Sequence, residues 1–138
     1  MLIRNNDQET RNKQETNNNN QILKPKRFDL EERTTKFAKL VIRLCRSLPR
    51  DAVNLRLVTQ IVGSAGSIGA NYREANDALG KRDFALRVKT ARKEAKETLH
   101  WLELIEEANP SVRHEIALLK SEAIELRNIL SAIINKIQ

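Results

Sequence analysis

The stretch LVTQIVGSAGSIGANY, residues 57–72, decides the fold of this chain. It contains no charged residue, although 31% of the whole sequence is charged, and Arg56 and Arg73 stand directly outside its two ends. The stretch is too short and too often interrupted by polar side chains to cross a bilayer. An uncharged segment in so charged a chain predicts instead the middle of a long helix that is buried all round.

Two stripes run along this helix with the alternating spacing of three and four residues that keeps a seam against a partner helix. The first stripe consists of Leu55, Val58, Val62, Ala65, Gly69, Tyr72, Asn76 and Leu79. The second consists of Leu57, Ile61, Ser64, Ile68, Asn71 and Ala75. A helix at the edge of a monomeric bundle needs one stripe, so two stripes indicate either a central position or a second chain. We therefore take the second stripe as the candidate oligomer interface.

Gly63, Gly66 and Gly69 recur every three residues within the stretch. Each glycine inside a helix costs about 1 kcal/mol relative to alanine, so we predict that they serve close backbone approach. A kink between two shorter helices is the alternative. A phosphate-binding glycine loop is not indicated, because no strand precedes the glycines and the spacing is not G-x-G-x-x-G.

Length and composition indicate one helical domain. A chain of 138 residues can bury a sizeable core, and aromatic residues make up only 4% of it. Cys45 is the only cysteine, so no internal disulfide can form and a reducing cytoplasm is expected. No hydrophobic signal segment is visible. The net charge of +7 suits an acidic partner such as RNA without being specific for it.

Turn residues divide the rest of the chain into four helices. Residues 1–27 are rich in Asn, Gln and charges and predict a flexible tail, whose basic end is either a solvated linker or a nucleic-acid arm. Residues 28–138 are expected to form an all-α, antiparallel up-down-up-down four-helix bundle, because short connections force antiparallel neighbours. The expected helix N-caps are Asp29, Asp51, Asp83 and Ser111.

The same signals mark where the helices end. The first helix is expected to stop before Pro49, the second near Leu79 and the third near Ala108. Gly80 has the character of a residue that follows a helix C-terminus, which would place Lys81 and its neighbour in a tight turn.

Two segments of the sequence resemble a known family. Residues 62–75, VGSAGSIGANYREA, and 91–102, ARKEAKETLHWL, are similar to bacterial four-helix-bundle proteins first found encoded in intervening sequences of 23S ribosomal RNA genes. The resemblance covers about residues 28–138. The residues that match the family pattern are Ser67, Ile68, Ala70, Asn71, Glu74, Glu94, Glu97, Trp101 and Leu102.

The resemblance carries expectations of its own. It implies a cytoplasmic bundle that assembles into a homo-pentamer, and for most members of the family no activity is established. A related branch contains the accessory variability protein of diversity-generating retroelements, a basic pentamer that binds a reverse transcriptase and its template RNA. RNA and a reverse transcriptase are therefore the partners that the resemblance offers, besides further copies of the chain.

The third helix carries the clearest charge pattern. If Phe84, Val88 and Ala91 face the core, the basic residues of its first half share the outer face, and a basic residue at the end of the second helix can join them. The candidate nucleic-acid-binding residues are Arg73, Lys81, Arg82, Lys89, Arg92, Lys93 and Lys96. The alternative is a solvated face with Lys–Glu pairs. No stacking aromatics accompany these residues, so at most backbone or shape recognition of RNA is indicated.

Other polar residues have structural explanations. Glu97 and His100 have the Glu-x-x-His spacing of di-iron bundles, but their register places them outside and no second such motif exists. Ser64 and Asn71 are expected to hydrogen-bond within the helix or fix its register. Glu74 is expected to pair with a basic residue of the third helix.

The glutamates at the end of the third helix oppose the dipole of that helix. Glu103, Glu106 and Glu107 are expected to meet a basic neighbour, for instance one of Arg33, Lys36 and Arg43.

Two histidines and one cysteine make no catalytic constellation, so we expect no enzyme, cofactor, metal or catalytic residue. The sequence instead favours a non-enzymatic homo-oligomer that binds RNA or an RNA–protein complex through its basic face. The alternative is a structural or adaptor protein that binds a protein partner and has no role with nucleic acid.

Overall fold

A computed structural model describes residues 26–137 of the chain, and a division between two units of the chain falls after Leu30. Of the expected tail, residues 1–25 lie outside the described residues, whereas Lys26 and Arg27 already belong to a helix. The helices are α3 (Lys26–Arg46), α4 (Ala52–Asn76), α5 (Lys81–Ala108) and α6 (Arg113–Ile137), with a short 3-10 turn η1 (Pro110–Val112) before α6.

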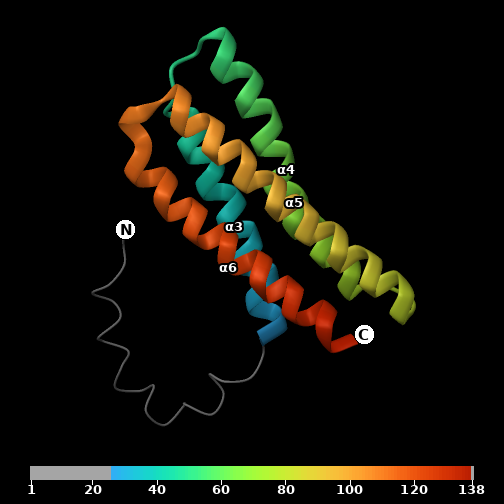
Figure 1. Cartoon of the computed structure of the whole chain (residues 1–138). Helices are drawn as coiled ribbons and strands as arrows, with labels where there is room; N and C mark the ends of the chain where they lie inside the picture. The colour runs from blue at the N-terminus through green and yellow to red at the C-terminus, as the bar shows by residue number, and fades with distance from the viewer. Residues whose placement is uncertain (1–25, 138) are drawn as a thin grey trace, which may run out of the picture. The chain divides into compact units, whose positions relative to one another are not determined.

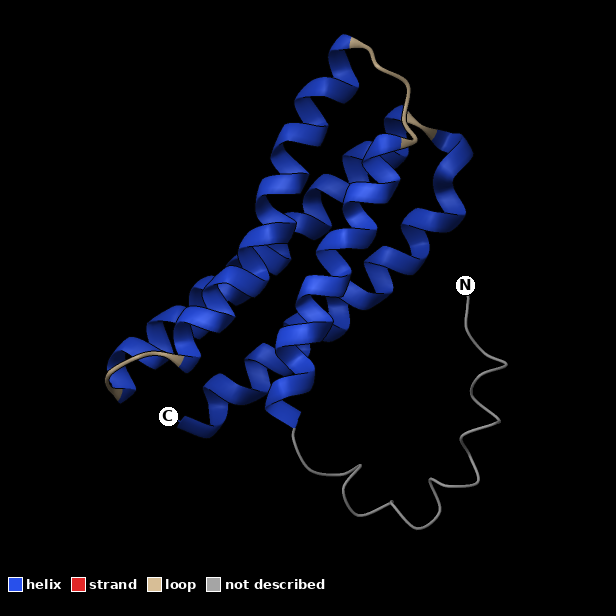
Figure 2. Cartoon of the chain, turned by 180° about the vertical axis from the view of Figure 1, so that it is seen from behind, coloured by secondary structure: helices blue, strands red, loops and turns tan. Residues whose placement is uncertain are grey.

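Within residues 31–138 the four helices pack as a bundle, and the chain reverses direction at each connection (Figure 1). Helix α4 packs along α5, and α5 packs along α6. Thr34 of α3 meets Gly69 of α4, and Arg33 of α3 binds Glu122 of α6. Each helix therefore has two neighbours, and the view from behind shows the same four helices with short loops between them (Figure 2). The expected all-α four-helix bundle is confirmed.

The cap predicted for the central helix is confirmed, and its end differs from the prediction. The backbone N–H of Asn54 donates to a carboxylate oxygen of Asp51 at 2.8 Å, which satisfies one free donor at the start of α4. The helix ends at Asn76, with Asp77 as its C-cap. Gly80 does not follow α4 directly but is the N-cap of α5, with an extended φ of −164°.

The other three predicted caps are wrong by a few residues. Asp83 lies in the first turn of α5, where a carboxylate still complements the helix dipole without accepting a capping bond. Asp29 lies inside α3, which begins at Lys26. Ser111 lies within η1, because Pro110 sets the φ angle of a tight turn there and α6 begins only after it.

A buried amide pair holds the connection between α5 and α6 against the start of α4. The side-chain amide of Asn109 donates to Asn54 Oδ1 at 2.8 Å, and the amide of Asn54 donates to Asn109 Oδ1 at 3.0 Å. The amide of Asn109 also donates to the backbone carbonyl of Ile105, and that of Asn54 to the carbonyl of Pro49, each at 3.0 Å. Both side chains are buried, so these reciprocal bonds are what makes two polar groups tolerable there.

Only one of the three glycines of α4 serves close approach. A Cβ atom at Gly69 would stand 2.8 Å from Oγ1 of Thr34, which is fully buried, so a larger residue does not fit there. Cβ atoms at Gly63 and Gly66 would meet nothing within 4 Å. Since α4 is one helix from Ala52 to Asn76, the alternative of two shorter helices is excluded.

Candidate nucleic-acid interface

The first half of α5 presents a basic outer face. Val88, Ala91 and Ala95 are fully buried and orient the helix, so that Lys89 and Lys96 remain exposed on the side away from the core. The four basic residues of this face are spaced three or four apart, which makes them neighbours on the helix surface. We call this set the α5 basic strip, and it consists of Lys89, Arg92, Lys93 and Lys96.

Arg92 lies at the edge of the strip that adjoins α6. Its Nη1 atom donates to Oγ of Ser131 on α6 at 3.3 Å, and the side chain is half-buried. Ser131 carries no signal of its own in the sequence that would mark it as part of a site. Aligning the third and fourth helices as an antiparallel pair joined by a short turn could have indicated Ser131. Such an alignment places Arg92 and Ser131 at the same height along the two helices.

The strip contains no ion pair within the part of the chain that the structure describes. Arg87, on the other flank of α5, is by contrast 3.9 Å from Glu74 and donates to Asn71 Oδ1 at 3.3 Å. The expectation that Glu74 pairs with a basic residue of the third helix is confirmed. The strip therefore consists of cations that form no ion pair with a carboxylate among the described residues.

Arg73 does not join the strip. Its guanidinium donates to Glu31 at 3.1 Å and to Thr35 Oγ1 at 3.2 Å, and both partners belong to α3. It therefore lies on the flank of α4 that faces α3, away from the α6 side of α5. The prediction failed because a position near the end of a neighbouring helix does not define the side on which its residue lies.

Lys81 and Arg82 are the first two residues of α5 rather than parts of a turn, and both are exposed. Arg82, Lys89 and Lys96 follow one another at intervals of seven residues, so Arg82 extends the outer face of the strip toward the start of the helix. Cations at a helix N-terminus oppose its dipole, so local helix stability does not account for this pair.

Glu94 and Glu97 are the acidic residues adjacent to the strip in sequence. Burial raises the pKa of Glu94 above its ordinary value, the charge of Glu97 raises it further, and Lys93 opposes the shift. Lys93 is therefore the member of the strip whose charge an acidic neighbour partly offsets. Arg92, by contrast, contacts α6 through Ser131.

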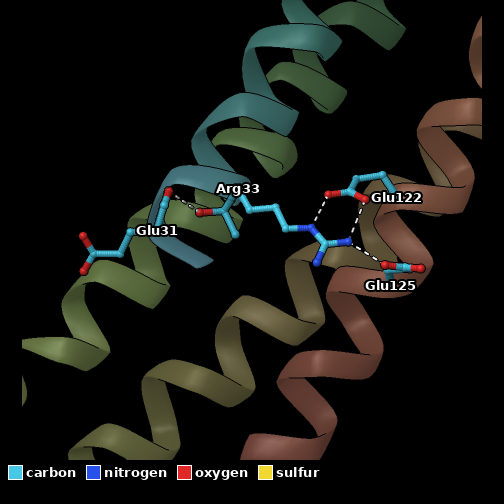
Figure 3. A network of polar contacts seen from close by, with 5 residues as sticks. Glu31, Arg33, Glu122 and Glu125 are labelled. Carbon is cyan, nitrogen blue, oxygen red and sulfur yellow. Dashed lines mark hydrogen bonds and ion pairs between the residues drawn. The ribbon is translucent and has the colours of Figure 1, made fainter. Parts of the chain in front are cut away.

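A second exposed basic surface, missed by the sequence analysis, lies on α3. It consists of Lys36, Lys39, Arg43 and Arg46. This surface borders a more acidic environment, because Arg33 of α3 reaches to Glu122 and Glu125 on α6 (Figure 3). The α5 basic strip thus differs from it by having no glutamate of α6 turned toward it.

The contact around Arg33 joins α3 to α6. Nε and Nη2 of Arg33 donate to the two carboxylate oxygens of Glu122 at 2.7 and 2.9 Å, and Nη2 also donates to Glu125. The hydrogen bond to Glu122 raises the pKa of Arg33, against the opposing effect of burial. Glu31 points away from this cluster toward α4 (Figure 3), where it accepts from Arg73 and Asn76.

The expectation of a basic neighbour is confirmed for Glu106, although its partners are not the three residues given as examples. Glu106 accepts from Lys120 of α6 at 3.0 Å and lies 3.6 Å from Arg113. Arg33 pairs with α6 instead, as described above. The ion-pair partner of a side chain depends on which neighbouring helix lies beside that flank of its own helix. Helical periodicity in the sequence does not show which helix that is.

The proposed interface stripe of α4 lies inside a single chain. Ile61, Ser64, Ile68 and Ala75 are buried there, and Leu57 is half-buried. The stripe faces α5, as the hydrogen bond of 2.8 Å between the hydroxyl groups of Ser64 and Thr98 shows.

Asn71, the remaining member of the second stripe, is half-buried and donates to the Ser67 carbonyl at 2.9 Å. In the first stripe, Gly69 faces α3, where it meets Thr34. The second stripe is thus packed within one bundle and is not an exposed contact surface, whereas Leu55, Val62 and Leu79 of the first stripe remain exposed.

Other groups that could support chemistry lie apart from one another. Glu97 and His100 are both exposed, and no group of three potential metal ligands occurs among residues 26–137. Burial raises the pKa of the Cys45 thiol to about 11, so it stays protonated at neutral pH. None of the helices in the described part of the chain combines the length and apolar character needed to cross a membrane.

The fold and surface define a class: an all-α four-helix bundle with an unpaired basic strip on one outer face. The model of the 23S rRNA-intervening sequence protein family matches residues 26–132, so the chain belongs to that family. The resemblance inferred from residues 62–75 and 91–102 is thereby confirmed at the level of the family.

A solved structure supports the same assignment. It is that of a protein with unknown function from the S23 ribosomal protein family of Bacteroides thetaiotaomicron. That protein is 29% identical in sequence, and the match covers 76% of this chain and 97% of that chain with a TM-score of 0.68. No protein of curated function matches the sequence.

Proposed function

We propose that this chain is a non-enzymatic, homo-oligomeric bundle that binds the phosphate backbone of RNA, alone or within an RNA–protein complex. The observation that carries the proposal is the α5 basic strip, whose cations form no ion pair within residues 31–137. Such cations bind phosphates by releasing the counterions of the nucleic acid, so affinity should fall as salt rises. The residues from Lys89 to Lys96 include no aromatic side chain, which supports backbone rather than base recognition.

The outer face of α4 supports the homo-oligomeric part of the proposal. No charged residue lies between Arg56 and Arg73, and within that span Val62 remains 37% exposed. We place self-association on this face, and the resemblance to the family implies that the assembly is a pentamer. The exposed residues that define the α4 outer face are Leu55, Thr59, Val62, Gly63, Gly66 and Ala70.

The same face also favours the second candidate function, an adaptor that binds a protein. A reverse transcriptase is the partner that the family resemblance offers. Apolar and small side chains can dock a protein helix without phosphate contacts, so this binding would depend little on salt. Salt dependence therefore separates the two candidate functions.

The test is a titration of labelled RNAs of unrelated sequence with the full-length chain at several salt concentrations. We expect all RNAs to bind, with affinity falling linearly on a double-logarithmic plot against salt. Replacing Lys89, Lys93 and Lys96 by Glu should weaken binding more than tenfold while far-ultraviolet circular dichroism stays unchanged.

A matched control makes the same change of charge on α3. Replacing Lys36, Lys39 and Arg43 by Glu alters the net charge equally, so its effect should be clearly smaller if the α5 basic strip is the binding surface. Equal loss in both triple variants would show attraction by net charge alone. Absence of RNA binding by the unaltered chain would leave the adaptor function as the remaining candidate.

A further inference from the structure

We infer that the phosphate-binding surface extends from α5 to α6, with Arg127 as its further cation. An RNA strand would lie along the line where the outer flanks of the two packed helices adjoin, which we call the groove. The inference rests on the proposed function and specifies where the strand lies. It assigns a role to a residue that the sequence analysis did not select.

The register between the two helices brings Arg127 opposite the strip. The hydrogen bond from Arg92 to Ser131 marks where α5 and α6 are level. The helices run in opposite directions, so one turn forward on α5 lies beside one turn backward on α6 (Figure 1). Lys96 is four residues after Arg92, and Arg127 is four residues before Ser131. Lys96 and Arg127 therefore face the same part of the groove.

Two cations facing one another are unfavourable unless an anion lies between them. Arg127 forms no ion pair in the part of the chain that the structure describes, and its guanidinium donates only weakly to Oδ1 of the adjacent Asn128, at 3.3 to 3.4 Å. The acidic residues of α6 nearby, Glu122 and Glu125, are turned to Arg33 on the opposite flank.

The other end of the same groove shows the contrasting arrangement. There Glu106 of α5 accepts from Lys120 at 3.0 Å and lies 3.6 Å from Arg113. Cations at that end are thus neutralised within the chain, whereas those around Lys96 and Arg127 are not. The cations along the groove are thus ion-paired at the Glu106 end and unpaired around Lys96 and Arg127. The unpaired segment is the one suited to bind phosphates.

The side chains in this segment also have suitable chemistry. The planar guanidinium groups of Arg92 and Arg127 can each donate two parallel hydrogen bonds to phosphate oxygens, whereas Lys89 and Lys96 act as point charges. From Lys89 to Lys96 the helix rises about 10 Å, so a strand along the groove meets these cations in succession. The hydrogen bond to Ser131 already holds the Arg92 side chain at the α6 side of the groove. Arg92 therefore loses less conformational entropy when it binds a phosphate.

The test compares Arg127→Gln with Lys136→Gln, an equal change of charge on α6 at an exposed position outside the groove. RNA binding by the full-length chain is measured over a series of salt concentrations. Arg127→Gln should weaken binding and reduce the slope of the salt dependence by about one, whereas Lys136→Gln should leave the slope unchanged. Arg127→Lys should retain the slope, since the charge remains.

A second measurement needs no RNA. Removing one of two facing cations should leave the melting temperature of Arg127→Gln at low salt equal to or above that of the unaltered chain, whereas loss of a structural contact would lower it. If RNA binds and the triple change on α5 weakens it, but Arg127→Gln does not, this inference fails and the proposed function stands. If the unaltered chain binds no RNA, both fail.

Discussion

Gly63, Gly66 and Gly69 have the same spacing in the sequence and different surroundings in the bundle. Gly69 faces the fully buried Thr34 of α3, and the other two face open space on the outer side of α4. Close helix packing therefore explains one glycine of the series. The other two keep the α4 outer face flat, at the helix-propensity cost that any interior glycine carries.

Alanine substitutions at these three positions should have opposite effects. Gly69→Ala should lower the free energy of unfolding by about 1 to 3 kcal/mol, because the new methyl group overlaps a stiff, buried threonine side chain. Gly63→Ala and Gly66→Ala should raise it by up to about 1 kcal/mol each. Urea unfolding of the three variants measures this, and a stabilised Gly69→Ala would contradict the packing seen at Thr34.

Glu94 makes stability depend on pH in an unusual direction. Burial raises its pKa in the folded chain, so its contribution to stability is fully present below the ordinary value of 4.5 and is lost as pH rises through the folded pKa. Glu94→Gln should therefore raise the melting temperature at pH 7 and have little effect near pH 3. The quantity to measure is the difference in melting temperature between Glu94→Gln and the unaltered chain at each pH. A difference that grows toward low pH would contradict the prediction.

At the scale of elements, the bundle depends on contacts between flanks of helices. Arg33 is the clearest case, because its guanidinium holds both oxygens of Glu122 and links α3 to α6. The exposed fraction of the Arg33 side chain is 36%, so solvent screens the contact and limits its contribution.

Arg33→Met should reduce the free energy of unfolding by about 1 kcal/mol, because it removes a two-pronged, partly buried ion pair while retaining an apolar stem. Arg43→Met provides the control, since Arg43 is an exposed cation of the same helix without an ion pair among the described residues. Chemical unfolding at low and high salt measures both. Equal losses in the two variants would mean that the contact with Glu122 contributes nothing.

Helix identity and helix boundaries differ in how far the sequence reveals them. The apolar periodicity and Asp51 indicated α4 correctly, because both are local properties of the chain. The starts of α5 and α6 were misplaced, because Gly80 and Ser111 each suit more than one position at a helix end. Which position they take depends on how the adjoining helices pack.

At the scale of the whole molecule, the surface of one chain contains an uncharged face on α4 and a basic strip on α5. If copies associate through the α4 outer face, the α5 basic strips of several chains are presented together. Several strips in one assembly would bind a long RNA more tightly than one strip does. Once the first strip is bound, the other strips are held at a high effective concentration near the same RNA.

Ala70→Glu should dissociate the assembly, because it places a charge in the middle of the proposed contact face without disturbing the core. Ser121→Glu on the exposed side of α6 is the control and should leave the assembly intact. Light scattering should then give a multiple of 15.8 kDa for the unaltered chain and the control, and a lower mass for Ala70→Glu. An assembly that survives Ala70→Glu lies on another face.

The sequence by itself determined the four helices and the basic outer face of α5, because helical periodicity and charge are local properties of the chain. Only the tertiary structure decided that the second stripe of α4 is packed within one bundle, that Arg73 pairs with α3, and that Arg92 contacts Ser131 on α6. The physical reason is that the partner of a side chain depends on the register and neighbours of its helix. Packing of the whole bundle sets both.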